Sequence, residues 1–310
     1  MGGEEAAVFA RGLTKGYGKS EVLKGVDLEI PHGSVFCLLG PNGAGKTTVI
    51  SILATLLRPD GGEARICGYD VVRQAAEARR HFSLTGQYAA VDELLTAREN
   101  LVMIGRLFHI QDPKRKADEL LEQFGLTADA HKVVSAYSGG MRRRLDIAMS
   151  LTADPEVIFL DEPTTGLDPQ SRLETWGTVR ELADGGTTVF LTTQYLDEAE
   201  RLADTIAILN GGKIAEQGTP EELRSLVARS SLVLSFATPA DCLAATERLA
   251  GYAFSVEHTV ALSVATDGSM AATMDVLERL SGLNVAQMEQ KRASIEDVFL
   301  EFVAGKGGGR

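Results

Sequence analysis

The segment GPNGAGKTT, residues 40–48, constrains the fold of this chain more than any other segment. It follows an apolar run, SVFCLL, and opens a helix that we expect to begin at Lys46. Glycines let the backbone approach an anion closely, and the N–H groups of this loop point inward at the positive end of the helix. This order of strand, loop and helix predicts a phosphate-binding loop, in which Lys46 contacts the β and γ phosphates of a nucleotide and Thr47 ligates Mg²⁺. The residues expected to surround the nucleotide are Gly40, Pro41, Asn42, Gly43, Ala44, Gly45, Lys46, Thr47 and Thr48.

The composition of the 310-residue chain is that of a globular protein, with 44% apolar and 24% charged residues. The net charge of −12 argues against a general nucleic-acid binder, which needs a basic face, and Arg142–Arg144 is expected to be a solvated helix face. The cysteines Cys37, Cys67 and Cys242 lie far apart, so they predict core thiols rather than a disulfide framework or a zinc site. Neither a bilayer-length apolar run nor a signal peptide is visible, which predicts a cytoplasmic chain.

Alternating strands and helices in the first two-thirds of the chain predict an α/β fold. The strands are GSVFCLLG, VIFLDEP and TTVFLTT, and they precede helices from Lys46, from about Pro169 and through 196–203. This alternation implies a parallel sheet with helices on its faces. Between about 88 and 153 apolar residues recur at helical spacing, which predicts an inserted helical subdomain. We expect this first domain to span residues 1–225.

The pattern of predicted strands and helices changes after about Arg229. The remaining segments predict the order β-α-β-β-α-β, a ferredoxin-like arrangement, in a small α+β domain over residues 230–305. The segment TPEELRSLVARSS is expected to be a linker, and 306–310 a flexible tail. Because the acidic residues of this domain are scattered along helices, we expect it to serve regulation or assembly rather than catalysis.

The segment VIFLDEP ends an apolar strand with two carboxylates. Asp161 is placed to hold Mg²⁺, directly or through water, and Glu162 is placed to orient and deprotonate a water that attacks the γ-phosphate. An Asp-Glu pair can also be a helix N-terminal charge pair, but the phosphate-binding loop upstream favours catalysis. Together the two motifs predict a P-loop NTPase.

The segment AYSGGMRRRL adds a second candidate anion site. Ser138, Gly139 and Gly140 present a hydroxyl and bare backbone N–H groups at a helix N-terminus. Since the chain already has one phosphate-binding loop, we expect these residues to bind the nucleotide of a second copy in a two-fold dimer. The alternative is a plain helix cap.

With these motifs in this order, residues 6–220 resemble the ATP-binding cassette (ABC) family of ATPases. The resemblance implies that Tyr17 stacks on adenine, that Gln87 contacts Mg²⁺ and the attacking water, and that Asp168 lies at the dimer interface. YSGGM is similar to the family signature LSGGQ, with Tyr137 in place of Leu and Met141 in place of Gln.

The family's switch histidine falls at Gln194, in TTQYLDEAE, so this sequence departs from the common pattern. A glutamine amide can donate a hydrogen bond to the γ-phosphate but cannot carry a proton or a positive charge. We therefore expect Gln194 to be a neutral sensor and Glu162 to be the base. This variant and the C-terminal SIEDVFLEF resemble the daunorubicin-resistance type of antibiotic-exporter ATPases.

The resemblance implies a transport-coupled ATP hydrolase. We expect two copies to dimerise around two Mg-ATP and to drive export of a drug, secondary metabolite or lipid through a separately encoded transmembrane permease. The chain would then lie on the inner face of the plasma membrane, touching the permease through the segment ELLTARENLVMIGRL, unless the apolar face of that segment packs inward. A soluble ATPase that drives a non-transport process is the alternative. An importer is disfavoured, because sugar importers carry small β-barrels in place of an α+β domain.

Overall fold

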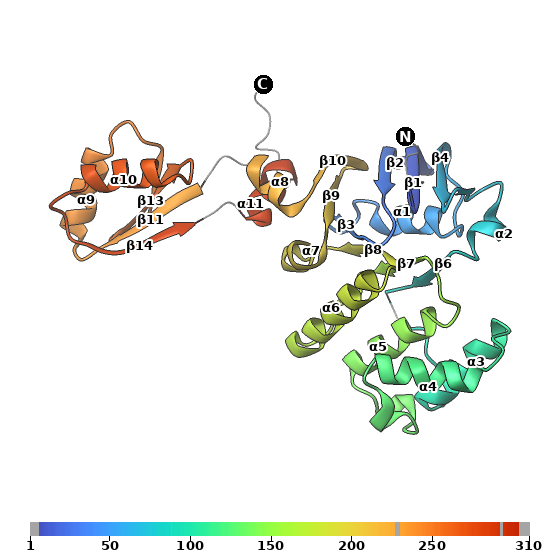
Figure 1. Cartoon of the computed structure of the whole chain (residues 1–310). Helices are drawn as coiled ribbons and strands as arrows, with labels where there is room; N and C mark the ends of the chain where they lie inside the picture. Colours follow the sequence, from blue (N-terminus) through green and yellow to red (C-terminus); the bar gives the residue numbers. More distant parts are fainter. Residues whose placement is uncertain (1–5, 88, 227–229, 292–293, 304–310) are drawn as a thin grey trace. The chain divides into compact units, whose positions relative to one another are not determined.

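The computed structural model describes residues 6–87, 89–226, 230–291 and 294–303 (Figure 1). The chain forms two compact units, Met1–Pro220 and Glu221–Arg310. The expected tail, 306–310, lies outside the described residues.

A six-stranded sheet forms the centre of the first unit, in the order β10-β9-β3-β8-β7-β6. β9, β3, β8, β7 and β6 are parallel, and β10 is antiparallel to β9. Every residue of β3, β7 and β8 is buried, which explains why these strands read as continuous apolar runs. The bounds are β3 Val35–Leu39, β6 Phe82–Thr85, β7 Val157–Asp161, β8 Thr188–Thr193, β9 Thr205–Asn210 and β10 Lys213–Gly218.

A second, antiparallel sheet is formed by strands that come before β6 in the chain. The sequence did not predict this sheet. Its order is β2-β1-β4-β5, with β1 Val8–Tyr17, β2 Ser20–Ile30, β4 Gly61–Ile66 and β5 Tyr69–Asp70. Buried residues of both sheets and of α1 (Lys46–Leu53) belong to one hydrophobic core, which includes Leu13, Ile30, Phe36 and Phe159. Irregular pairing between β1 and β2 interrupts the alternation of apolar and polar residues, which hides this sheet in the sequence.

The predicted helical insertion is present as α3 (Ala97–Leu107), α4 (Pro113–Gln123) and α5 (Gly139–Ser150). Figure 1 shows these helices gathered together, and α3 begins with a capping box formed by Thr96 and Glu99. The other helices of this unit are α2 (Ala75–Ala78), α6 (Pro169–Asp184) and α7 (Leu196–Leu202), and two short 3₁₀ turns lie at Thr127–Asp129 and Val134–Ala136.

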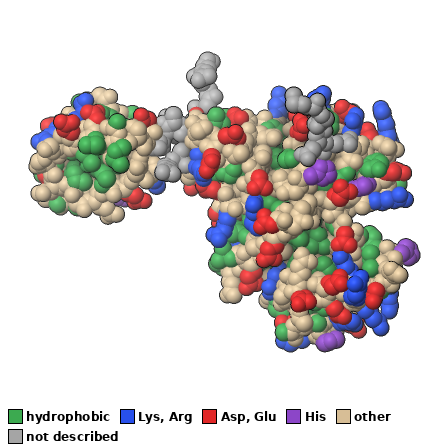
Figure 2. All heavy atoms as spheres, in the orientation of Figure 1, with side chains coloured by type: hydrophobic (Ala, Val, Ile, Leu, Met, Phe, Trp, Pro, Cys, Tyr) green, Lys and Arg blue, Asp and Glu red, His purple; other side chains and the backbone are tan. Residues whose placement is uncertain are grey.

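The second unit has the β-α-β-β-α-β order expected from the sequence. Its antiparallel sheet runs β12-β13-β11-β14, and its core joins strands to helices through Leu232, Cys242, Leu262 and Val276. The elements are β11 Ser230–Phe236, α9 Pro239–Arg248, β12 Phe254–His258, β13 Ala261–Thr266, α10 Met270–Arg279, β14 Val285–Lys291 and α11 Ile295–Val303. Figure 2 shows apolar side chains gathered on one face of this unit.

Two expectations need correction. The segment predicted to be a linker contains a helix, α8 (Pro220–Leu226), whose Leu223 is fully buried. Cys37 and Cys242 are buried as expected, but Cys67 is half-buried in the turn between β4 and β5, with a φ of 46°.

Candidate nucleotide site

The phosphate-binding loop connects the carboxyl end of β3 to α1. The Gly40 N–H donates to the Thr193 carbonyl at 3.2 Å, which fixes the loop to the end of β8. A Cβ on Gly40 would lie 2.5 Å from the Leu209 carbonyl oxygen, so only glycine fits there. Gly45 precedes α1 with a φ of 111° and no side-chain cap, and the first N–H groups of the helix are available to an anion.

Four segments from different parts of the chain surround one cavity of about 480 Å³ at this edge of the sheet. They are β2, the phosphate-binding loop with the start of α1, the turn after β6 and the carboxyl end of β7. The lining residues are Val22, Asn42, Gly43, Gly45, Lys46, Thr47, Thr48, Gln87, Asp161 and Glu162. The cavity therefore unites both motifs that predicted nucleotide chemistry.

Thr192 of the neighbouring strand β8 holds the Asp161 carboxylate and the Glu162 backbone at the end of β7. The Thr192 hydroxyl donates to Asp161 Oδ1 at 2.5 Å, and its oxygen accepts from the Glu162 N–H at 3.1 Å. Glu162 has a φ of 47°, a conformation that is rare for a residue with a side chain and that aims it into the cavity.

Lys46 is only 5% exposed and lies between the loop and Glu162. Its Nζ donates to the carbonyl oxygens of Gly40 at 2.8 Å and Pro41 at 3.3 Å, and lies 3.2 Å from Glu162 Oε1. A buried ammonium with these weak neutral acceptors and one carboxylate is well placed to exchange partners for phosphate oxygens.

The loop that carries Gln87 is tied to α5 by a buried arginine. Arg143 Nη1 donates to the Gly86 carbonyl at 2.7 Å and to Asp146 Oδ2 at 3.2 Å, and Asp146 Oδ1 accepts from the Ala90 N–H at 3.0 Å. Burial raises the pKa of the Asp146 carboxyl, opposed by that N–H and by Arg143. The expectation that Arg142–Arg144 forms a solvated face is therefore wrong for Arg143, which is 5% exposed.

Ser138, Gly139 and Gly140 lie at the start of α5 and are not among the residues that line the cavity. Ser138 Oγ accepts from the Met141 N–H at 3.2 Å, so within one chain it caps the helix. A Cβ on Gly140 would lie 2.3 Å from Oγ of Ser171. Glycine is therefore needed at this position because α5 and α6 approach each other closely.

Asp168 likewise caps a helix within one chain. It accepts from the N–H groups of Gln170 at 3.1 Å and Ser171 at 3.0 Å, and from the Ser171 hydroxyl at 2.6 Å. The Ser171 hydroxyl holds the pKa of the Asp168 carboxyl below its usual range. Tyr137, just before the glycines, is buried, and its hydroxyl donates to the Asp129 carbonyl at 2.7 Å.

Tyr17 and Gln194 lie outside the cavity lining. Tyr17 ends β1 and is 52% exposed, while Val22 of the adjacent strand lines the cavity. Gln194 is half-buried and follows β8 directly, one residue beyond the carbonyl of Thr193 that holds Gly40.

Sequence reasoning missed Glu198, which is fully buried in α7 behind the site. Its Oε1 accepts from the Thr164 hydroxyl and from Trp176 Nε1, both at 2.9 Å. Burial raises the pKa of this carboxyl, against the opposing effect of hydrogen bonds from Thr193, Trp176 and Thr164. In the sequence DEAE nothing distinguishes this acid from its exposed neighbours.

Comparison with known proteins agrees with this arrangement. The ABC transporter family model matches residues 23–165. The daunorubicin resistance ATP-binding protein DrrA3 of Streptomyces coeruleorubidus is 44% identical over 304 residues, which cover 96% of each chain. The chain belongs to the ABC transporter family. This membership confirms the resemblance and the P-loop NTPase fold.

A second sequence relative and a solved structure are also similar to this chain. The daunorubicin/doxorubicin resistance ATP-binding protein DrrA of Streptomyces peucetius is 46% identical over 303 residues, covering 95% of this chain and 91% of that protein. A dimeric ATP-binding cassette, solved in a post-hydrolysis state with ADP and phosphate, is 26% identical with a TM-score of 0.61, over 68% of this chain and 98% of that chain. No helix in the described part of the chain combines the length and apolarity that a bilayer crossing demands.

Proposed function

We propose that this chain is the ATP-hydrolysing subunit of an ABC exporter, working as a dimer around two Mg-ATP. One observation carries the proposal. A single cavity brings Lys46 and Thr47 of the phosphate-binding loop together with Asp161, Glu162 and Gln87. The residues of the YSGGM signature segment do not line this cavity.

Glu162 is the proposed catalytic base. In the structure Lys46 pairs with Glu162 Oε1 at 3.2 Å, and the phosphates of ATP would draw the ammonium toward themselves. The carboxylate would then be released to accept a proton from water attacking the γ-phosphate. Its positive φ and the hydrogen bond from its backbone N–H to Thr192 support this role, because they fix the backbone from which the side chain lines the cavity.

The donors around the cavity fit Mg²⁺. Thr47 offers a hydroxyl, Asp161 a carboxylate and Gln87 an amide oxygen, and magnesium prefers hard oxygen ligands of this kind. When bound, the ion would neutralise charge that develops on the β and γ phosphates. Asp161 is pre-oriented for this by the Thr192 hydroxyl at 2.5 Å.

A second copy would complete each site. Ser138, Gly139 and Gly140 start α5 with backbone N–H groups that the cavity of their own chain does not use. In a two-fold dimer these groups would meet the γ-phosphate held by the partner, and Asp168 would lie nearby at the interface. Tyr17 would stack on adenine next to Val22, and Gln194 would donate to the γ-phosphate as a neutral sensor.

Coupling to a permease is proposed at the helical insertion, on the surface around α3. Leu94 is 86% exposed before α3, and Leu107 and Phe108 are exposed at its end. Leu101 and Val102 of the same helix are buried, so part of this segment packs inward while its ends offer exposed apolar side chains to a partner. Because Arg143 ties α5 to Gly86, movement of the Gln87 loop would be transmitted to this surface.

The relatives named for daunorubicin and doxorubicin resistance support an amphipathic drug or secondary metabolite as cargo. The chain would accordingly work on the inner face of the plasma membrane, bound to its permease. Non-transport work remains the competing function, and it makes a different prediction about the partner.

Co-purification separates the two functions. The chain is expressed with the membrane protein encoded beside it, the membranes are solubilised in detergent, and ATP turnover is followed through gel filtration. Co-elution of turnover with the membrane subunit, and its alteration by amphipathic drugs, is the expected result. Turnover that stays in the soluble fraction, or migrates with ribosomes or nucleic acid, would overturn the transport function.

A further inference from the structure

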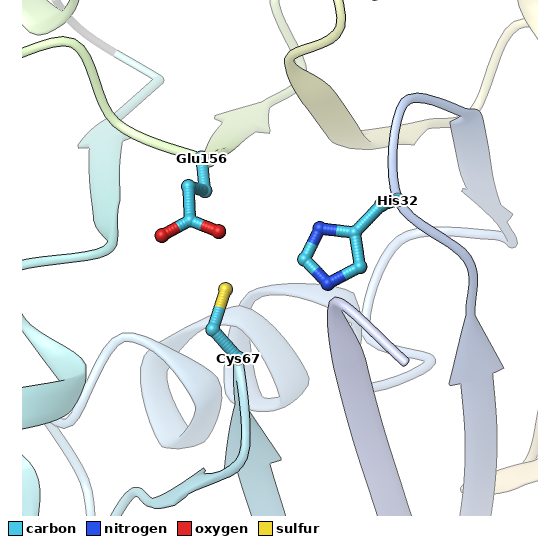
Figure 3. Close-up of side chains that lie close together, drawn as sticks. All are labelled: His32, Cys67 and Glu156. Atoms are coloured by element: carbon cyan, nitrogen blue, oxygen red, sulfur yellow. The ribbon is translucent and has the colours of Figure 1, made fainter. Parts of the chain in front are cut away.

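Three side chains that bind metals well lie together in the first unit, outside the nucleotide cavity. They are His32, Cys67 and Glu156, and their candidate ligand atoms all lie within 4.8 Å of one another. Figure 3 shows the Cys67 sulfur and the Glu156 carboxylate pointing toward each other, with the His32 ring beside them. An imidazole, a thiol and a carboxylate are the side chains that bind zinc in proteins.

These residues come from three separate turns at one edge of the central sheet. His32 lies between β2 and β3, Cys67 between β4 and β5, and Glu156 immediately before β7. Asp161 ends β7, so the strand separates the cluster from the nucleotide cavity by roughly 16 Å at about 3.3 Å per residue. The cluster therefore lies at the amino ends of the parallel strands, opposite the nucleotide site.

The backbone holds two of the three residues in place. The Cys67 N–H donates to the Ala7 carbonyl at 2.9 Å, and the Glu156 N–H donates to the His81 carbonyl at 2.9 Å. The Glu156 carbonyl accepts from the Thr188 N–H at 2.8 Å. Only side-chain movements are then needed to bring the ligand atoms closer.

A second histidine orients the carboxylate. His81 Nδ1 lies 2.6 Å from Glu156 Oε1, and the His81 ring stacks on Tyr69 with centroids 4.8 Å apart. The His81 hydrogen bond, with smaller contributions from the Cys67 thiol and the His32 imidazole, holds the pKa of the Glu156 carboxyl below its usual range. Hydrogen-bonded carboxylates of this kind are typical around metal ligands.

We propose that His32, Cys67 and Glu156 form a binding site for a divalent transition metal of the zinc class. Zinc binds sulfur at about 2.3 Å and nitrogen or oxygen at about 2.0–2.2 Å, which places ligand atoms roughly 3.3–3.7 Å apart in a tetrahedron. Since these atoms lie within 4.8 Å of one another, each pair needs to approach by at most about 1.5 Å, within the reach of side-chain rotation. Three protein ligands leave a fourth position for water.

The donor set distinguishes this site from the magnesium site of the nucleotide cavity. Thiolate and imidazole favour zinc and its neighbours in the transition series, whereas magnesium prefers oxygen donors. A bound ion would clamp the antiparallel sheet, which provides Cys67, to the central sheet, which follows Glu156. The proposed role is therefore structural.

Cobalt binding tests the site directly, because a thiolate bound to Co²⁺ gives a charge-transfer absorption band in the near ultraviolet. The full chain is freed of metal with a chelator and titrated with Co²⁺ and then Zn²⁺ without nucleotide. We expect one Co²⁺ per chain with this band, and loss of the band when Zn²⁺ is added. The band should disappear in Cys67→Ser, and His32→Ala and Glu156→Gln should each weaken binding at least about tenfold.

Two matched controls use residues outside the cluster. Cys242→Ser removes a thiol of the second unit and His131→Ala an exposed imidazole, and both should bind Co²⁺ like the parent chain. Absence of the band in the parent chain, or its survival in Cys67→Ser, would overturn the proposal.

A measurement on the unmodified chain covers the case in which a variant fails to fold. Alkylation of Cys67, followed by mass spectrometry, should slow at least about tenfold when Zn²⁺ is present, because a metal-bound thiolate is a poorer nucleophile. Equal alkylation rates with and without Zn²⁺ would reject the site.

Discussion

Gln194 shows how one residue can change the chemistry expected of a whole site. It follows β8 next to Thr193, whose carbonyl holds the phosphate-binding loop at 3.2 Å. Substitution Gln194→His should leave ATP turnover close to that of the parent chain, because either side chain can donate to the γ-phosphate. Gln194→Ala should lower turnover about 10- to 150-fold, the equivalent of one charge-assisted hydrogen bond. Steady-state turnover checks both, and a Gln194→His chain that binds ATP but is inactive would contradict the sensor role.

Glu198 provides a prediction about pH, again from a single side chain. Its pKa is raised by burial, so its favourable contribution to folding is present below the unfolded pKa and is lost as the pH rises through the folded pKa. When the pH is raised from about 5 to about 8, the free energy of unfolding should therefore fall less in Glu198→Gln than in the parent chain. Glu198→Ala should lose about 1–3 kcal/mol, because Thr164 and Trp176 would be left without their acceptor.

Trp176 is the only tryptophan of the chain and donates to Glu198, so its fluorescence can follow unfolding at this position. Denaturant titrations at several pH values measure the free energy of unfolding for each variant. The same pH dependence in Glu198→Gln and the parent chain would show that this carboxyl is not the titrating group.

At the scale of elements, the Arg143–Asp146 pair connects α5 to the Gln87 loop. Arg143→Ala should cost about 3–5 kcal/mol, because it leaves the buried Asp146 carboxylate without its partner. Arg142→Ala is the matched control. Arg142 makes a more exposed pair with Glu93 at 2.8 Å, and its loss should cost less than about 1 kcal/mol. Chemical denaturation measures both values, and equal costs would contradict the proposed importance of burial.

The sequence predicted the elements whose patterns are local. Continuous apolar strands identified β3, β7 and β8, and the glycine-rich loop identified the start of α1. The antiparallel sheet escaped prediction because bulged pairing interrupts its alternation, and the buried state of Arg143 escaped because it depends on the Gly86 carbonyl, 57 residues away. The cluster around Cys67 escaped for the same reason, since its three turns meet only in the folded chain.

At the scale of the whole molecule, the nucleotide cavity is built entirely from the first unit, from Val22 to Glu162. Deleting the residues after Arg229 should therefore leave ATP affinity within about threefold of the full chain while weakening assembly with a second copy or with the permease. The exposed apolar side chains of the second unit, among them Val256, Met270 and Met274, support a docking role. Nucleotide titration and co-purification provide the measurements, and undiminished assembly would contradict this role.

The dimeric, ATP-hydrolysing site is the central claim, and the variant Glu162→Gln tests it most directly. It keeps the shape of the side chain but removes the proposed base, so turnover should fall about 10²- to 10⁴-fold while ATP still binds. Because ATP is then not consumed, light scattering in Mg-ATP should give the mass of a dimer, and in ADP the mass of a monomer. A Glu162→Gln chain that hydrolyses ATP at the parent rate, or that stays monomeric while saturated with Mg-ATP, would contradict the account.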